Sequence, residues 1–165
     1  MKFILYIALY KKQYHYILLI IFILFLVLFN IFQFSKIRSY KTITRTSDNE
    51  FGIQLELICH GIETIEEAKV KDSVDEKILG TAILSSATGQ ATSVYIQTSY
   101  YEENKLLYTA LWNLNNTISN NTRINNLLET HDFSTLIPII RSLKENPLDK
   151  DVTEKLYLYF RDIQF

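Results

Sequence analysis

An uninterrupted apolar run near the amino terminus constrains this chain more than any other feature. Residues 16–29 read YILLIIFILFLVLF, and the run reaches Phe34 if Asn30 and Gln33 are tolerated near its end. A helix over that stretch would be roughly 28 Å long at about 1.5 Å per residue, which suits a hydrocarbon core of about 30 Å. The run therefore predicts a retained transmembrane helix over residues 14–34.

Two other interpretations of the run are weaker. A cleaved signal peptide has a shorter apolar core followed by small residues, whereas here Phe32, Gln33 and Phe34 follow. A buried helix of a soluble domain needs a larger body around it than this chain supplies. Charge leaves the orientation open, because three lysines precede the span and four basic residues follow it. The predicted membrane-anchoring side chains are Tyr16, Leu18, Ile21, Phe25, Leu28, Phe32 and Phe34.

Charge divides the chain into a basic first part and an acidic remainder. All 18 acidic residues lie at or after Asp48, and the 17 Lys and Arg divide into seven before it and ten after it. The remainder therefore carries ten minus eighteen charges, or −8, which disfavours nucleic acid because phosphates would repel it. The single Cys59 excludes an intrachain disulfide.

We predict four segments, namely an N-terminal segment (1–13), the membrane helix (14–34), a juxtamembrane stalk (35–49) and one small ectodomain (50–165).

The ectodomain sequence predicts an α+β fold with an antiparallel sheet and C-terminal helices. Residues 51–57 alternate between apolar and polar, which is the period of a half-buried strand. Residues 93–101 (SVYIQTSYY) are rich in β-branched and aromatic side chains. Residues 105–114 (KLLYTALWNL) would return beside them through a loop at residues 102–104. A hairpin is therefore expected at this point of the chain.

Helices are expected around and after this sheet. Residues 62–78 predict a short exposed helix, and the small polar residues 85–92 (SSATGQAT) predict a turn. A helix capped by Asp132 should be kinked or split at Pro138, which removes a backbone hydrogen bond. Asp149 is positioned to cap a final helix, although its second half also reads as a strand.

Little in the sequence indicates catalysis. Cys59 and His60 are neighbours, and on a strand they would point to opposite faces, so a nucleophile–base pair is disfavoured. His60 and His131 with a carboxylate lack the spacing of a metal site. The four glycines are scattered, so no phosphate-binding loop is present. We predict a non-enzymatic protein with no cofactor, no metal and no small-molecule substrate.

Aromatic side chains cluster across the predicted hairpin at Tyr100, Tyr101, Tyr108 and Trp112. Simple cross-strand packing is one interpretation of the cluster. The other is a protein-binding face, because Tyr and Trp are favoured at interfaces.

Two segments resemble a known family. The stretches TAILSSATGQATSVYI (81–96) and NLLETHDFSTLIPIIRSLK (126–144) are similar to the short, N-terminally anchored subunit of the poxvirus entry–fusion complex, the G-fragment third-reading-frame family. In that family an anchor precedes a small body with a Thr-Ala-Ile start and, near its end, an acidic residue leading into Leu-Leu-Pro-Ile-Leu. This chain departs from it in being longer, with an Asn-rich stretch at 113–126 and an extension beyond Lys144.

The resemblance implies a subunit of a multiprotein complex that fuses virion and host membranes. Its body would lie on the surface of the mature virion, after passage through host membranes during assembly. Its partners would be other small anchored subunits, one of them in direct contact. The residues carried over as a candidate partner interface, together with the aromatic cluster, are Thr81, Ala82, Ile83, Tyr100, Tyr101, Tyr108, Trp112, Asp132, Leu136, Ile137 and Pro138.

Two alternatives remain open on the sequence. A bacterial single-pass envelope scaffold with a small extracytoplasmic domain fits the anchor and the acidic body equally well. An anchored enzyme would need a deep cleft containing His60 or His131, which the sequence does not indicate.

Overall fold

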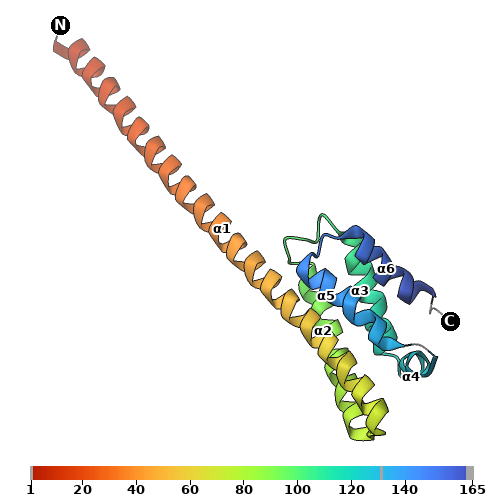
Figure 1. Ribbon diagram of the computed structural model, residues 1–165. Helices are drawn as coiled ribbons and strands as arrows, with labels where there is room; N and C mark the ends of the chain where they lie inside the picture. Colours follow the sequence, from red (N-terminus) through yellow and green to blue (C-terminus); the bar gives the residue numbers. More distant parts are fainter. Residues whose placement is uncertain (1, 131, 163–165) are drawn as a thin grey trace. The chain divides into compact units, whose positions relative to one another are not determined.

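The computed structural model describes residues 2–130 and 132–162, and every regular element in that part of the chain is a helix (Figure 1). The predicted antiparallel sheet is therefore wrong, and the α+β assignment with it. The chain divides into two compact units, Met1–Thr42 and Ile43–Phe165. The elements are α1 (Lys2–Lys71), α2 (Val74–Tyr95), α3 (Lys105–Ile118), α4 (Asn121–Thr130), the 3₁₀ turn η1 (Phe133–Thr135), α5 (Leu136–Glu145) and α6 (Lys150–Asp162).

The first unit is the N-terminal part of α1. The side chains of residues 16–42 are all exposed. The helix contains a window with a mean hydropathy of 2.9, none of it buried, so it is long and apolar enough to cross a membrane. Residues 35–49, predicted as a stalk, continue the same helix without a break.

Residues 51–57 also belong to α1, so the strand predicted there is wrong. Of the four apolar residues that suggested alternation, Phe51 and Leu55 are buried, whereas Ile53 and Leu57 are exposed. Spacings of three and four residues, the period of one helix face, separate the buried residues Phe51, Leu55, Ile58, Ile62 and Ile65. Within residues 51–57 a period of two fits the apolar residues as well, but only the helical period continues through Ile58, Ile62 and Ile65.

The predicted hairpin consists instead of the end of α2, a region of turns and α3. Residues 105–114 open α3, whose buried side chains Leu107, Ala110, Leu111, Leu114 and Ile118 again follow a helical period. The turn predicted at 85–92 lies inside α2, where Ala87, Thr88 and Ala91 are buried. Thr88 faces α3, where its hydroxyl lies 3.3 Å from Oδ1 of Asn115.

α1 and α2 are joined by a sharp turn. The helix predicted over 62–78 is interrupted there, because α1 ends at Lys71 and Asp72 adopts a positive φ of 53°. Ser73 then starts α2, and its hydroxyl oxygen accepts a hydrogen bond from the Glu76 N–H at 3.3 Å.

Two glycines bring the backbones of α1 and α2 together. A Cβ atom added to Gly61 of α1 would lie 2.9 Å from the backbone nitrogen of Leu84. One added to Gly80 of α2 would lie 3.0 Å from the carbonyl oxygen of Gly61. Side chains larger than hydrogen do not fit at this contact.

Pro138 lies in the first turn of α5, and the segment predicted as one helix from Asp132 is divided into η1 and α5 two residues before it. Asp132 caps η1, accepting from the Ser134 N–H at 3.1 Å, and α5 begins only at Leu136. The backbone nitrogens of a first turn have no partner within their own helix, so the missing N–H of proline costs little there. The chain thus starts a new helix just before the proline.

The core of the second unit is built around α3, which contacts α2, α4 and α6, while α5 packs on α6 (Figure 1). The ring of Phe51 in α1 lies 4.9 Å from that of Tyr95 in α2. The predicted final helix is confirmed as α6, with Asp149 accepting from the Val152 N–H at 3.0 Å and Leu156 and Phe160 buried.

Candidate partner-binding surfaces

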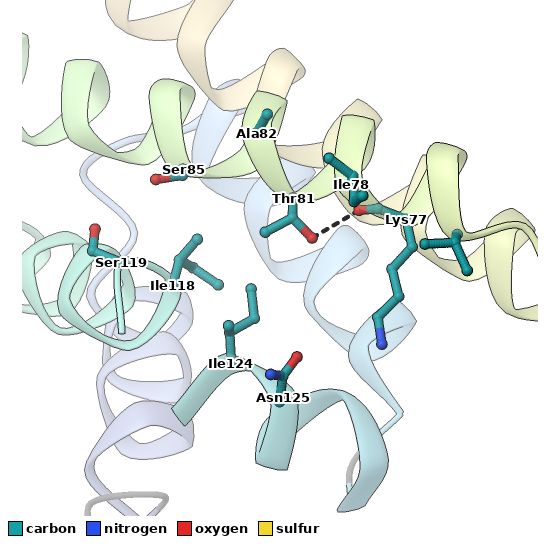
Figure 2. Close-up of a pocket in the computed structure, with 10 residues that line it drawn as sticks. Lys77, Ile78, Thr81, Ala82, Ser85, Ile118, Ser119, Ile124 and Asn125 are labelled. Atoms are coloured by element: carbon teal, nitrogen blue, oxygen red, sulfur yellow. Dashed lines mark hydrogen bonds between the residues drawn. The ribbon is translucent and has the colours of Figure 1, made fainter. Parts of the chain in front are cut away.

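An open hollow of about 380 Å³ lies in the second unit between α2, the end of α3 and α4 (Figure 2). We call it the α2–α4 hollow. Thr81, Ile118 and Ile124 point into the space between the three helices, and Lys77 extends along its open side. Its lining consists of Val74, Lys77, Ile78, Thr81, Ala82, Ser85, Ile118, Ser119, Ile124 and Asn125.

The chemistry of the hollow is mainly apolar. Val74 and Ile78 keep 69% and 63% of their surface exposed, which is unusual for neighbouring β-branched apolar residues on a water-facing helix. The Thr81 hydroxyl donates to the carbonyl oxygen of Lys77 at 2.8 Å and so is already engaged. Lys77 supplies one cationic group beside the hollow. Such a surface suits apolar side chains bordered by an acidic group.

A second depression, the α1 groove, has a volume of about 690 Å³. Its lining consists of Asp48, Asn49, Gly52, Ile53, Glu56, Leu57, Tyr100 and Lys144. The Lys144 ammonium lies 2.6 Å from a Glu56 carboxylate oxygen, and this ion pair lowers the pKa of Glu56. The charges that border the groove are thus partly neutralised by each other, which leaves Ile53 and Leu57 as its exposed apolar part.

The predicted interface residues do not form one surface. Thr81 and Ala82 line the α2–α4 hollow, and Ile83 is partly buried beside them in the chain. Tyr100 lines the α1 groove, whereas Trp112 is 48% exposed on α3.

The aromatic cluster is only partly retained. Tyr101 stacks edge-on against both Tyr95 and Tyr108, with ring centroids 6.0 Å apart in each pair. Tyr101 and Tyr108 are half-buried and pack against the core, so they join the loop before α3 to α2 and α3. These contacts join a loop to two helices, so they are not the cross-strand packing that the sequence predicted.

The candidate interface residues within 126–144, the second segment that resembles the poxvirus family, have structural roles in the fold. Asp132 caps η1, and Leu136 has no exposed surface. The carbonyl oxygen of Ile137 lies 4.0 Å from the Sγ atom of Cys59 in α1. Pro138 is exposed. Replacing Leu136 by a charged residue would therefore disturb the core, so such a variant cannot report on a partner.

Groups that could perform chemistry are separated in the structure. Cys59 is buried, and burial raises the pKa of its thiol from 9.0 to about 11, whereas His60 is exposed on the same helix. His131, the other histidine considered for a metal site, lies outside the described residues. Within the part of the chain that the structure describes, no three His, Cys, Asp or Glu side chains are grouped to hold a metal ion.

Of the ten residues that line the α2–α4 hollow, the sequence analysis selected only Thr81 and Ala82. Val74 and Ile78 were assigned to one short exposed helix over residues 62–78, but the turn at Asp72 places them on α2, where they are exposed beside the hollow. Ile118 and Ile124 come together only because α3 and α4 pack side by side. No spacing in the sequence relates these positions.

Comparisons with known proteins identified no relative of this chain. No protein family, no curated protein and no solved structure matches this chain.

Proposed function

We propose that this protein is a non-enzymatic, single-pass membrane subunit whose helical domain binds another anchored protein. The observation that carries the proposal is the α2–α4 hollow, an apolar depression with Val74 and Ile78 exposed at its edge. Exposed apolar surface of this kind marks protein interaction sites on domains that otherwise face water. The apolar helix in Met1–Thr42 supplies the anchor in this proposal.

The occupant we propose is an apolar segment of the partner, flanked by an acidic side chain that pairs with Lys77. A small-molecule ligand fits the hollow less well, because ligand sites enclose their ligand and present several convergent polar groups. The α2–α4 hollow is open, and its Thr81 hydroxyl already donates within α2. An apolar helix laid against α2 and α4 would cover the exposed side chains of Val74 and Ile78, above the buried Ile118 and Ile124 that line the hollow.

More specifically, we propose that the protein is a subunit of a viral entry–fusion complex in the virion membrane. Its support is the resemblance of residues 81–96 and 126–144 to the poxvirus family. The first of these segments contributes Thr81, Ala82 and Ser85 to the lining of the hollow. On this proposal the family-like residues of α2 contact another small anchored subunit, and the body faces outward from the virion.

The test is affinity purification of the tagged full-length chain from mild-detergent extracts, followed by mass spectrometry of the proteins recovered with it. The informative variant is Ile78→Glu, which places a charge at the edge of the hollow on a side chain that is 63% exposed. The matched control is Ile53→Glu in the α1 groove, where the side chain is 53% exposed. Both substitutions should leave folding intact, since neither side chain is in the core.

We expect wild type and Ile53→Glu to recover the same small membrane proteins in fixed proportion. Ile78→Glu should lose at least nine tenths of the direct partner while remaining in the membrane fraction. Loss of the partner in Ile53→Glu instead would transfer the site to the α1 groove. Recovery of bacterial envelope components would replace the viral assignment with the scaffold alternative, and a solitary protein would contradict both.

A further inference from the structure

One face of α1 carries residues whose polarity is opposite to that of their surroundings. Within the apolar run, Asn30 and Gln33 are polar and lie three residues apart. In the polar stretch that follows, residues 35–42 (SKIRSYKT), Ile37 and Tyr40 are the apolar residues. Each lies seven residues after Asn30 or Gln33, so all four share one face of the helix. Ile37 and Tyr40 are exposed by 53% and 72%.

The seven-residue spacing of this face can be extended toward the amino terminus, where every residue from 16 to 29 is apolar. Ile23, Asn30 and Ile37 occupy one heptad position, called a, and Leu19, Leu26, Gln33 and Tyr40 occupy the other, called d. We call these seven residues the α1 seam. Isoleucine at a with leucine at d is the arrangement that favours parallel two-stranded coiled coils. A single Asn at an a position sets the register and the two-stranded state.

The Asn30 side chain has hydrogen-bonding capacity that its own helix does not use. Its Nδ2 donates to the carbonyl oxygen of Leu26 at 2.9 Å. The carbonyl group Oδ1 can accept two further hydrogen bonds. In a hydrocarbon environment such a group needs a partner from another helix, because lipid offers none.

We propose that a second copy of this chain packs in parallel along the α1 seam, with the two Asn30 side chains hydrogen-bonded to each other. Two copies inserted in the same membrane have the same orientation, so their Asn30 residues lie at the same depth. A carboxamide is self-complementary, since it both donates and accepts. Outside the apolar run, Ile37 and Tyr40 of the two copies would cover each other. The inference rests on the proposed membrane anchor and goes beyond the partner proposed at the α2–α4 hollow.

One electrostatic term opposes the dimer. Lys36 and Lys41 flank the seam at the g and e positions, where parallel helices bring g of one copy near e of the other. Their like charges are exposed, so salt screens the repulsion. Dimer formation should therefore increase as the salt concentration rises.

The test is oxidative cross-linking of the full-length chain in phosphatidylcholine vesicles at low protein-to-lipid ratio. Ile37→Cys places a thiol on the seam, and Ser35→Cys places one on the opposite face of the same helical turn. The native Cys59 stays in both variants, because it is buried with a raised pKa. The wild-type chain measures any cross-linking through Cys59. Resistance to alkaline extraction, measured on the same samples, reports membrane insertion separately.

We expect Ile37→Cys to give a dimer about tenfold more efficiently than Ser35→Cys. Adding Asn30→Leu to Ile37→Cys should lower the dimer yield about tenfold, the size expected for one interhelical hydrogen bond in a membrane. Equal cross-linking at positions 35 and 37, a monomer throughout, or a yield unaffected by Asn30→Leu would each overturn the dimer. Loss of the protein from the membrane fraction would instead contradict the anchor on which the inference depends.

Discussion

At the scale of single residues, glycines show how closely α1 and α2 approach each other. Gly61→Ala would bring its new Cβ to 2.9 Å from the Leu84 backbone nitrogen and 3.1 Å from the Gly80 carbonyl oxygen. Because backbone atoms cannot move aside as side chains do, the two helices would have to separate. We expect Gly61→Ala to destabilise the domain by about 1–3 kcal/mol. Urea unfolding of the full chain in mild detergent, followed by the fluorescence of Trp112, would measure the change.

Gly52 is the matched control for this substitution. It lies in the same helix, and an added Cβ would meet no atom within 4 Å. Since alanine favours a helix over glycine, Gly52→Ala should stabilise the domain by about 0.5–1 kcal/mol. Equal effects at both positions would show that the contact at Gly61 is not tight.

The buried thiol of Cys59 gives the stability a dependence on alkaline pH. Desolvation raises its pKa from 9.0 to about 11 in the folded chain. The unfolded chain therefore releases the thiol proton first, and its population is favoured as pH rises. The contribution is complete below pH 9 and is lost between pH 9 and about 11. Unfolding midpoints measured across that range should fall more steeply for wild type than for Cys59→Ala.

A chemical measurement tests the same burial. A thiol reagent should leave Cys59 unmodified at pH 8 in the folded chain and modify it fully after unfolding in urea, because the thiolate is the reactive form. Rapid modification of the folded protein at pH 8 would show that Cys59 is accessible.

At the scale of the element, α5 shows how a proline is accommodated within a short helix. Pro138 is exposed in the first turn, where α5 needs no hydrogen bond from its nitrogen, whereas Ile140, two residues further on, is buried. We expect Pro138→Ala to change the free energy of unfolding by less than about 1 kcal/mol. Ile140→Ala should cost about 2–5 kcal/mol, because it leaves a cavity in the core.

The same urea titration compares these two variants. If Pro138→Ala stabilised the domain by several kcal/mol, the proline would be a strained residue in the interior of a helix that starts earlier, near Asp132. The structure instead begins α5 at Leu136.

At the scale of the whole molecule, the division at Thr42 and Ile43 predicts two separable parts. Among the residues whose side chains the structure describes, the buried apolar residues lie in the second unit, beginning with Phe51. A fragment of residues 43–165 should therefore fold without the apolar helix and remain in the aqueous phase. Circular dichroism should show a strongly helical protein that unfolds in a single transition. A disordered or aggregated fragment would contradict the division.

How much could be predicted from the sequence depended on the length of the pattern available. The apolar run of α1 was identified because it is long and unbroken, and the final helix was identified from its Asp149 cap, although residues 156–160 also read as a strand. The strand at 51–57 was wrong because seven residues cannot distinguish a period of two from one of 3.6 when all odd positions are apolar. Residues 85–92 were misread because small polar residues, typical of turns, also allow two helices to approach closely.

The candidate site depended on tertiary structure to a greater extent. Thr81 and Ala82 were selected from the resemblance, but their neighbours in the hollow, Ile118 and Ile124, lie on other helices. Leu136 was selected for an interface and is instead a core residue. Whether an apolar side chain is buried or exposed depends on which helix packs over it, and that information is not local in the sequence.

The sequence by itself determined that this chain has a long apolar helix, an acidic body and a single thiol, because length, charge and composition do not depend on how the chain folds. Only the tertiary structure decided that every regular element in the described part of the body is a helix, and that Val74 and Ile78 are left exposed beside a hollow. The physical reason is that β-branched and aromatic residues have only weak intrinsic preferences. Burial against α1, α2 and α3 outweighed those preferences and placed these residues in helices.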